Sequence, residues 1–298
     1  MARPPRRIGI DVGGTKIAAV ALDAGDRVIF EARVATPGSY DGLVSAVAGL
    51  VQAAGEGPVG LGAPGSESPV DGRWRNANLT FCNGRPFAAD LARAVARPLR
   101  VENDGNCLAL SEALTGAGQG YGTVVFMTIG TALGGGLVID GRLRSGRNRE
   151  AAEFGHTGLP WPRPDELPLL ACFCGKAGCA EQYVSGTGLE RDYARANGQT
   201  LPGAAIVAGA RAGEAAAQAA LARLQDRLAR VAANIVAVID PDLMVMGGSL
   251  AILPELVEEL PPLIARYSFS GTAQVPVVRA LHGGLSGAMG AARLWDQP

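Results

Sequence analysis

The stretch IGIDVGGTKIAAVALD, residues 8–23, decides the fold class. It consists of a short apolar run, a Gly-Gly turn and a second apolar run, which is the pattern of two β-strands joined by a tight connection. A similar stretch, TVVFMTIGTALGGGLVIDG, follows at residues 123–141. Because more strand and helix patterns follow each copy, the sequence predicts a duplicated α/β fold with two lobes and a cleft between them.

Helix and strand patterns alternate along the rest of the chain. Residues 40–53 place apolar side chains on one helical face, and residues 213–239 predict a long alanine-rich helix. A last helix is expected at about residues 285–295, where small side chains predominate. We place an N-terminal lobe at residues 1–117 and a C-terminal lobe at residues 118–298, with the last helix free to pack back on the first lobe.

The overall composition limits the classes of function. The chain has 298 residues and a formal net charge of −1, so no basic surplus points to nucleic acid. No apolar run is long enough to span a bilayer, and the first residues lack the apolar core of a signal peptide. We therefore expect a cytoplasmic protein without membrane contact, in which clustered cysteines are more often metal ligands or redox groups than disulfides.

Three glycine-rich turns each follow an apolar strand, at DVGGT (11–15), GTALGGG (130–136) and GGS (247–249). One Gly-Gly pair alone is explained by a tight hairpin turn. Three such strand ends in an α/β chain instead predict a nucleotide site, because glycine lets backbone N–H groups approach a polyanion. Asp11, at the end of the first strand, is suited to orient a hydrated Mg²⁺ ion.

Asp104 is the last residue of the strand pattern RPLRVEND and stands where a helix pattern begins. Aspartate is among the best N-cap residues, so a purely structural role is one explanation. The alternative is a carboxylate that accepts the proton of a sugar hydroxyl during phosphoryl transfer, a reaction in which the protein mainly positions the nucleophile and neutralises charge. Asn103 would then hydrogen-bond a neighbouring hydroxyl.

The segment CFCGKAGCAE, residues 172–181, contains three of the five cysteines. With His156 they form a Cys₃His set, which is typical of a tetrahedral structural Zn²⁺ site. The alternatives are a disulfide from Cys179 to Cys172 or Cys174, or free thiols. No ligand pattern surrounds the remaining cysteines and histidine, which are Cys82, Cys107 and His282, the last interpreted as a loop residue that caps the final helix.

The segments IGIDVGGTKIAAVALD, VENDGNC, AAEFGHTGLPW, CFCGKAGCAEQYVSGTG and DPDLMVMGGSL resemble, in order, the ROK family of bacterial sugar kinases. Within that family, GAPGSESPVDGRWRNANLTFCNGRPF at residues 62–87 looks most like the fructokinase and mannokinase branch. The resemblance implies an actin-like, hexokinase-like fold with two RNase H-like lobes. It also implies ATP- and Mg²⁺-dependent phosphorylation of a hexose, with fructose favoured and mannose or glucose as further substrates.

Several alternatives stay open beside fructokinase. Within the family they are an N-acetylglucosamine kinase and a glucokinase. A catalytically silent sugar sensor and a sugar-responsive repressor belong to other classes. The repressor would need a helix-turn-helix ahead of the first strand, for which we expect no room before Arg7.

The resemblance also assigns roles to single residues. It implies that Asp104 is the catalytic base and that the sugar is bound by Asn78, Asn103, Asp104, Glu153, His156 and Glu181. It implies ATP contacts from Asp11, Gly13, Gly14, Thr15, Lys16, Gly130, Thr131, Gly134, Gly135, Gly247 and Gly248, with Mg²⁺ held by Asp11 through water. The zinc ligands would be His156, Cys172, Cys174 and Cys179, and a homodimer is expected.

The zinc ligands lie close in sequence to two of the proposed sugar ligands. Glu153 precedes His156 by three residues, and Glu181 follows Cys179 by two. We therefore expect the metal to hold both glutamates in one rigid loop, as outer groups orient a site, without taking part in the chemistry.

Three positions depart from the family pattern. Ala132 and Ala152 stand where glycine is usual, and Gly284 stands where aspartate is usual. If position 132 requires a positive φ angle, its alanine adds backbone strain and weakens phosphate binding. Because the general base and the zinc ligands are intact, we still expect an active kinase.

Overall fold

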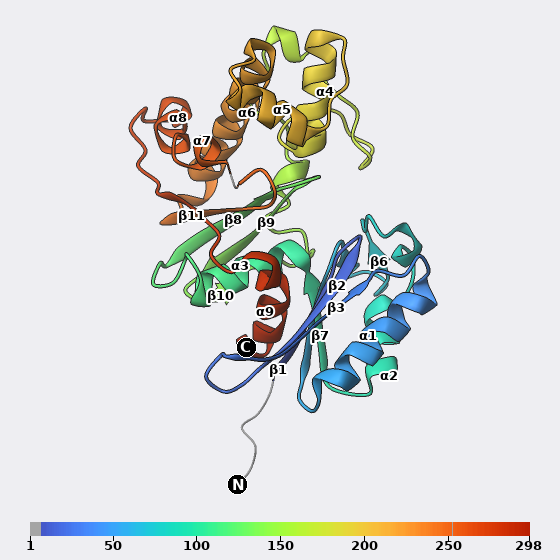
Figure 1. The fold of residues 1–298 in the computed structure, drawn as a ribbon. Helices are drawn as coiled ribbons and strands as arrows, with labels where there is room; N and C mark the ends of the chain where they lie inside the picture. Colours follow the sequence, from blue (N-terminus) through green and yellow to red (C-terminus); the bar gives the residue numbers. More distant parts are fainter. Residues whose placement is uncertain (1–6, 252) are drawn as a thin grey trace. The chain divides into compact units, whose positions relative to one another are not determined.

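The computed structural model describes residues 7–251 and 253–298, and these form an α/β fold (Figure 1). The strands are β1 (Arg7–Val12), β2 (Lys16–Leu22), β3 (Val28–Ala35), β4 (Val59–Ala63), β5 (Ser66–Glu67), β6 (Trp74–Arg75), β7 (Leu99–Asn103), β8 (Thr123–Ile129), β9 (Leu133–Ile139), β10 (Arg142–Leu143), β11 (Leu243–Gly247) and β12 (Val277–Arg279). The α-helices are α1 (Tyr40–Ala54), α2 (Phe87–Val95), α3 (Asp104–Thr115), α4 (Gly186–Asn197), α5 (Gly203–Arg211), α6 (Ala215–Ile239), α7 (Pro254–Val257), α8 (Leu260–Tyr267) and α9 (Ser286–Ala292). Short 3₁₀ helices are η1 (Thr80–Cys82), η2 (Phe154–His156), η3 (Pro164–Glu166), η4 (Ala180–Gln182), η5 (Gly283–Leu285) and η6 (Arg293–Asp296).

The first five-stranded sheet has the order β3-β2-β1-β4-β7. β1 and β2 pair antiparallel from Arg7 opposite Leu22 to Val12 opposite Ile17, as the strand-turn-strand pattern predicts. β4 lies parallel to β1 on its other side, and β7 lies parallel to β4. The carboxyl ends of β1 and β7 therefore meet at the same edge of this sheet.

The second five-stranded sheet has the order β10-β9-β8-β11-β12. Its turn-linked strands β8 and β9 come from the second glycine-containing stretch, and the later strands β11 and β12 are added on the other side. The first sheet follows the same succession. The duplicated α/β fold predicted from the sequence is thereby confirmed.

The described residues group into two compact units. Unit 1 contains the residues up to Phe126, then 136–152 and 281–298, and unit 2 contains 127–135 and 153–280. The final helix α9 belongs to unit 1 and lies against β1 and α3 of that unit (Figure 1). The predicted division of the chain after residue 117 stays a prediction.

Two helical predictions need correction. The long helix predicted at 213–239 begins at Ala215, because Gly213 has a φ angle of 90° and separates it from α5. The final helix predicted at about 285–295 consists of α9 followed by the 3₁₀ helix η6. Neither α4 nor α5 was predicted from the sequence pattern.

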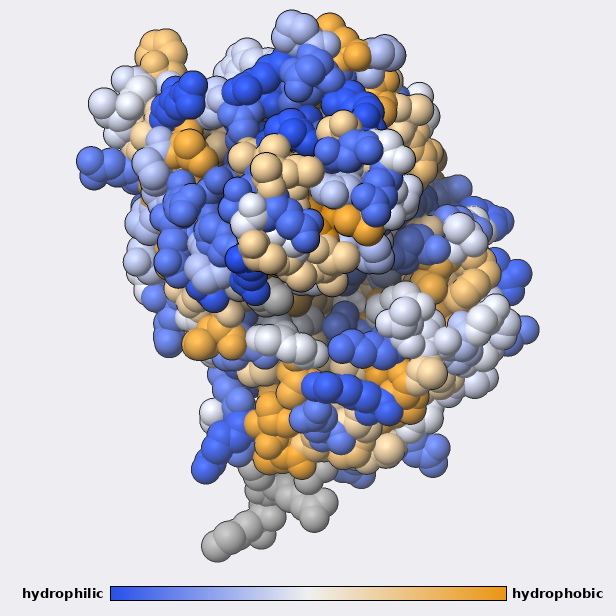
Figure 2. Space-filling view, turned by 45° about the horizontal axis from the view of Figure 1, so that its top comes forward, coloured by the Kyte–Doolittle hydropathy of each residue, from blue (hydrophilic) through white to orange (hydrophobic). Residues whose placement is uncertain are grey.

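In the described part of the chain, no helix is both long enough and apolar enough to cross a membrane. The longest described helix, α6, has 25 residues but includes Arg223, Asp226, Arg227 and Arg230. On the face shown in Figure 2, hydrophobic residues lie among hydrophilic ones.

Candidate functional site

Two carboxylates of unit 1 lie at strand ends on the same edge of the first sheet, in strands that β4 separates. Asp11 is the next-to-last residue of β1, and Asp104 directly follows β7. Burial, and after it the charge of Asp104, raises the pKa of Asp11 from 3.8 to about 7, while Lys16 acts in the opposite direction. Burial also raises the pKa of Asp104. The two acids therefore form an interacting pair of the kind that is common at functional sites.

Asn103, and not Asp104, is the N-cap residue of α3. Its Oδ1 accepts hydrogen bonds from the N–H groups of Gly105 at 2.8 Å and Asn106 at 3.3 Å, and its Nδ2 donates to the Gly65 carbonyl at 3.2 Å. Asp104 is the first helical residue, where its carboxylate also accepts the Gly105 N–H at 2.9 Å. The interpretation of Asp104 as the helix cap is therefore wrong, because the preceding residue occupies that position.

Glu102 is a buried acid that the sequence analysis missed, and it lies directly beside this pair. Its Oε1 accepts the Asn103 N–H at 2.8 Å and the Asn106 side-chain amide at 3.1 Å. Its Oε2 accepts the Ser145 hydroxyl and the Arg149 Nη1 at 3.3 Å. Four donors thus fix the end of β7 next to Asp104. The sequence carries no distinct signal for it, because β7 (LRVEN) also contains the charged residue Arg100.

The first glycine turn connects β1 with β2. The Gly13 N–H donates to the Lys16 carbonyl at 2.9 Å, and a Cβ atom at Gly13 would lie 3.1 Å from that oxygen. At Gly14, by contrast, a Cβ atom would meet no atom within 4 Å. Gly13 therefore serves the tight turn itself, and the space beside Gly14 is open for a bound group.

The second and third glycine turns are adjacent in unit 2. Gly248 has a φ angle of 89°, and a Cβ atom there would lie 2.4 Å from the Ile129 carbonyl oxygen, so glycine is required. The Gly130 carbonyl accepts the Gly186 N–H at 2.7 Å, and the Thr131 carbonyl accepts the Thr187 hydroxyl at 2.9 Å. The first turn of α4 therefore supports the second glycine turn.

The backbone at the two alanine departures is different from what we expected. Ala132 has no positive φ angle, so the condition for strain at that position is not met. Ala152 has a φ angle of 64°, a conformation that glycine adopts without strain. The strain caused by a missing glycine is therefore at the residue before Glu153.

The four predicted zinc ligands come together in unit 2. The ligand atoms of His156, Cys172, Cys174 and Cys179 all lie within 4.8 Å of one another. The His156 Nδ1 is 3.7 Å from the Cys172 sulfur, and the sulfurs of Cys174 and Cys179 are 3.5 Å apart. The three thiols are free in the structure, so neither of the alternative disulfides is present.

This donor set fits a structural zinc ion. Tetrahedral ligands at about 2.3 Å from zinc lie about 3.8 Å from one another, which is close to the observed separations. Gly175 and Gly178 have φ angles of 85° and 82°, so they permit the tight loop that brings the cysteines together. When bound, zinc would be held by all four side chains, and its role would be structural.

The zinc loop packs against the second glycine turn through Gly155. A Cβ atom at Gly155 would lie 2.1 Å from the Leu133 carbonyl oxygen and 3.4 Å from Cβ of Glu181. Glu181 is buried, and burial raises the pKa of its carboxyl against the opposing effect of His156. Glu153 directly precedes η2, so both proposed sugar-binding glutamates flank the metal ligands in unit 2.

The zinc loop is also held by a buried cluster of charged side chains that was not predicted from the sequence. Glu166 lies between ligands His156 and Cys172 in sequence and is 2% exposed. Its carboxylate accepts hydrogen bonds from Arg227 Nε at 2.8 Å and from Arg230 Nη1 at 3.0 Å, and both arginines are buried in α6. Although burial opposes it, these hydrogen bonds lower the pKa of Glu166 to about 2.

The remaining residues named in the sequence analysis lie outside the carboxylate pair, the glycine turns and the zinc loop. Asn78 is exposed in the segment before η1. Cys82 and Cys107 are buried, and Cys107 lies on α3. The His282 Nε2 lies 3.0 Å from the Thr115 hydroxyl, which joins the start of the last helical segment to the end of α3. His282 precedes the 3₁₀ helix η5 without a side-chain capping hydrogen bond, and the N-cap residue of α9 is Leu285, so the expectation that His282 caps the final helix is wrong.

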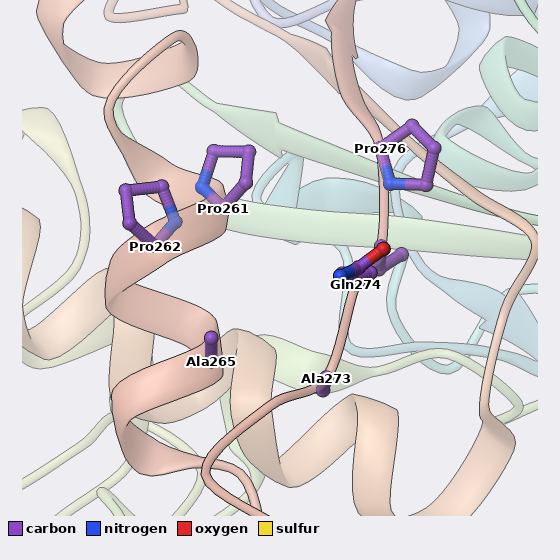
Figure 3. A pocket seen from close by; sticks show the side chains of 7 residues that line it. Pro261, Pro262, Ala265, Ala273, Gln274 and Pro276 are labelled. Carbon is purple, nitrogen blue, oxygen red and sulfur yellow. The ribbon is translucent and has the colours of Figure 1, made fainter.

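An apolar groove of about 380 Å³ lies between α8 and residues 273–276 in unit 2. As Figure 3 shows, it is lined on one side by prolines of α8 and on the other by the chain that leads to β12. Gln274 supplies the polar side chain of this lining. None of the residues predicted to bind sugar, ATP or metal lines this groove.

Comparisons with known proteins agree over nearly the full length. The profile of the ROK family matches residues 7–298. The chain is 40% identical to the N-acetyl-D-glucosamine kinase of Photobacterium profundum, over 96% of this chain and 98% of that protein. It is 39% identical to the N-acetyl-D-glucosamine kinase of Escherichia coli O157:H7, with the same coverage of both chains.

Solved structures of two ROK family proteins superpose on this chain over nearly its full length. The ROK hexokinase of Thermus thermophilus superposes with a TM-score of 0.85 and 31% identity over 96% of each chain. A ROK family glucokinase of Streptomyces griseus, in complex with glucose and AMPPNP, superposes with a TM-score of 0.79 and 32% identity over 97% of this chain and 98% of that one.

Proposed function

The chain belongs to the ROK family and is an ATP-dependent sugar kinase with the actin-like ATPase fold, and from this premise we propose that its substrate is N-acetyl-D-glucosamine. The observation that carries the proposal is the identity of about 40% to N-acetyl-D-glucosamine kinases over nearly the full length of both chains. The enzyme would transfer the γ-phosphate of ATP to a hydroxyl of that sugar.

The prediction of a fructokinase is not supported by these relatives. It rested mainly on residues 62–87, whose motifs resemble the fructokinase and mannokinase branch, with HTGLPWPRPDEL (156–167) and the closing RLW (293–295) in agreement. The full-length similarity instead supports the alternative that the sequence left open. A short stretch reports local backbone requirements as well as substrate. Gly65, for example, has a φ angle of 88°, and a Cβ atom there would lie 2.4 Å from the Arg75 carbonyl oxygen.

Asp104 is the proposed general base. Its raised pKa makes its carboxylate a better proton acceptor than an ordinary aspartate, which suits deprotonation of an attacking hydroxyl. Asn103 would donate or accept a hydrogen bond with the sugar while Glu102 and the α3 backbone hold it. Asn78 is proposed as a further sugar contact.

Glu153, Glu181 and His156 are the proposed sugar contacts of unit 2. The His156 Nδ1 faces the cysteine sulfurs, which leaves Nε2 on the other side of the ring for the sugar. Buried Glu181 would discriminate between sugars, because a missing hydroxyl would leave this polar group unpaired. The zinc site would hold these side chains in one loop without activating a hydroxyl.

ATP is proposed to bind at the three glycine turns. Gly14, Thr15 and Lys16 would contact phosphate oxygens from the first turn, and the adjacent second and third turns would contribute backbone groups from unit 2. When bound, Mg²⁺ neutralises charge on the phosphates, and Asp11 would orient its water ligands. Homodimer formation stays a prediction.

A sugar panel tests the proposed substrate. ADP release would be measured with N-acetyl-D-glucosamine, glucose, mannose and fructose under the same conditions. We expect kcat/KM for N-acetyl-D-glucosamine to exceed that for each other sugar at least about tenfold, as a site built around one set of hydrogen bonds allows. A preference for glucose would favour the second candidate, glucokinase, which the Streptomyces griseus relative supports. A preference for fructose would refute the proposal.

A base variant tests the proposed chemistry. Asp104→Asn should lower kcat by about 10²–10⁴-fold, the range of general base catalysis, with sugar binding still measurable. Asp140→Asn is the matched control, because Asp140 is an exposed residue of unit 1 at a turn with a φ angle of 51°, which asparagine tolerates. Near-normal turnover of Asp104→Asn would overturn the assignment.

A further inference from the structure

Gly287 in α9 contacts the carboxylate of Asp11. A Cβ atom at this glycine would lie 2.6 Å from both Cγ and Oδ2 of Asp11 and 2.9 Å from its Oδ1. Real Cβ atoms essentially never come so close to another heavy atom. The backbone of α9 therefore forms a wall against the side chain at the end of β1, and any larger residue at position 287 would move that carboxylate.

The helix cannot retreat from this contact, because glycines bring it equally close to its other neighbours. A Cβ atom at Gly9 in β1 would lie 1.8 Å from the Ala288 carbonyl oxygen, and one at Gly60 in β4 would lie 1.7 Å from that of Ala291. On the side facing α3, a Cβ atom at Gly290 would lie 1.7 Å from the Cys107 carbonyl oxygen. Backbone packs on backbone on both sides of α9.

The segment that enters α9 is fixed by Glu112, a fully buried residue of α3. Its carboxylate accepts the N–H groups of Leu281 and His282, each at 2.9 Å, and the Ser286 hydroxyl at 3.3 Å. A buried carboxylate with this many donors fixes its surroundings strongly, since breaking one bond leaves a buried charge less well paired. α3 thus carries Asp104 at its start and sets the position of α9 from its third turn.

We propose that Gly287 is a positioning residue for phosphoryl transfer and sets the orientation of the Asp11 carboxylate toward Mg²⁺–ATP. It does so because it has no side chain and lies on a helix whose position is fixed by Glu112. This inference rests on the proposed role of Asp11. It assigns a functional reason to one glycine of the C-terminal small-residue segment. Gly290 in the same segment serves packing only.

Three glycine-to-alanine variants separate positioning from packing. Gly287→Ala displaces the carboxylate, and a misplacement of about 1 Å can cost about 10²-fold in rate. We therefore expect kcat to fall about 10–100-fold and the Mg²⁺ concentration for half-maximal activity to rise, with KM for the sugar changed less than about twofold. Gly284→Ala is the matched control, because its Cβ would meet only Arg33 Nη2, at 3.9 Å.

Gly290→Ala is the packing control. Its clash with the α3 backbone should lower the melting temperature while the folded fraction keeps the wild-type Mg²⁺ requirement. A second readout is the rise in melting temperature on addition of Mg²⁺–ADP, which the wild type and Gly284→Ala should show and Gly287→Ala should lack. If Gly287→Ala has the Mg²⁺ requirement and the ligand-induced rise of Gly284→Ala, the proposal is wrong.

A stability cycle keeps the proposal testable if Gly287→Ala folds poorly. Asp11→Ala removes the atoms that the new Cβ would meet, so Gly287→Ala should lower the melting temperature much less in the Asp11→Ala protein than in the wild type. Equal losses in both backgrounds would show that the contact does not matter. If coupling is present but Asp11→Ala leaves the Mg²⁺ requirement unchanged, the proposed role of Asp11 fails while the contact stands.

Discussion

Asp11→Asn should stabilise the protein against unfolding while it abolishes efficient turnover. The substitution keeps the size of the side chain and removes a charge that the folded state holds at a cost. Burial and the charge of Asp104 raise the pKa of Asp11 from 3.8 to about 7. Between these two pH values the folded protein retains a proton that the unfolded chain has released, so stability falls as pH rises through this window.

The size of the effect follows from the two pKa values. At 1.36 kcal/mol per pKa unit, the difference in pKa between the folded and unfolded states lowers the free energy of unfolding by about 4 kcal/mol at pH 8 but by only about 1.5 kcal/mol at pH 5. Relaxation around the charge reduces both values. We therefore expect Asp11→Asn to be about 1–3 kcal/mol more stabilising at pH 8 than at pH 5.

Urea unfolding of the wild type and the variant at both pH values, without Mg²⁺ or nucleotide, measures this difference. Asp23→Asn is the control, because the Asp23 carboxylate accepts the N–H groups of Gly25 and Arg27 and its pKa is lowered by them. It should give no stabilisation at pH 8. An equal gain from Asp11→Asn at pH 5 and pH 8, or a loss at pH 8, would refute the argument that burial of this charge destabilises the fold.

Other outcomes can be checked with similar means. The kcat/KM for sugar should fall as pH is lowered through about 7, because Asp11 then takes up a proton, and the raised pKa of Asp104 acts in the same direction. A pH–rate profile that is flat from 5.5 to 8 would contradict this. Ala152→Gly should raise the free energy of unfolding by about 0.5–1 kcal/mol, because glycine adopts the positive φ angle of this position without strain. Ala132→Gly should give no such gain, and the denaturant midpoints of the two variants test this difference. Glu166→Gln should lower the free energy of unfolding by about 3–5 kcal/mol, because it leaves two buried arginines without a charged partner. A change below about 1 kcal/mol in urea unfolding would show that Glu166 does not stabilise this part of the fold. Cys174→Ala should abolish zinc binding, measured by atomic absorption, and raise KM for the sugar. An unchanged KM in the zinc-free variant would show that the metal does not hold Glu153 and Glu181 in place.

The features that depend on local pattern could be predicted from the amino-acid sequence. Apolar runs on either side of glycine turns specified strand-turn-strand units, and their repetition specified two sheets with the same succession of strands. The spacing of three cysteines, together with the histidine of the EFGH motif, identified a metal set whose ligand atoms do converge. These features were predictable because turn chemistry and metal ligation act through residue type and short separations along the chain.

The residues that support the site from distant parts of the chain became visible only in the folded structure. Glu102, Glu166 and Glu112 are ordinary charged residues in the sequence, and each becomes a buried acceptor only when distant segments supply its donors. The backbone angles at Ala132 and Ala152 likewise depend on how each loop is held. The contact between Gly287 and Asp11 joins residues at opposite ends of the chain, and no periodicity or motif records a steric limit that arises only when two backbones meet.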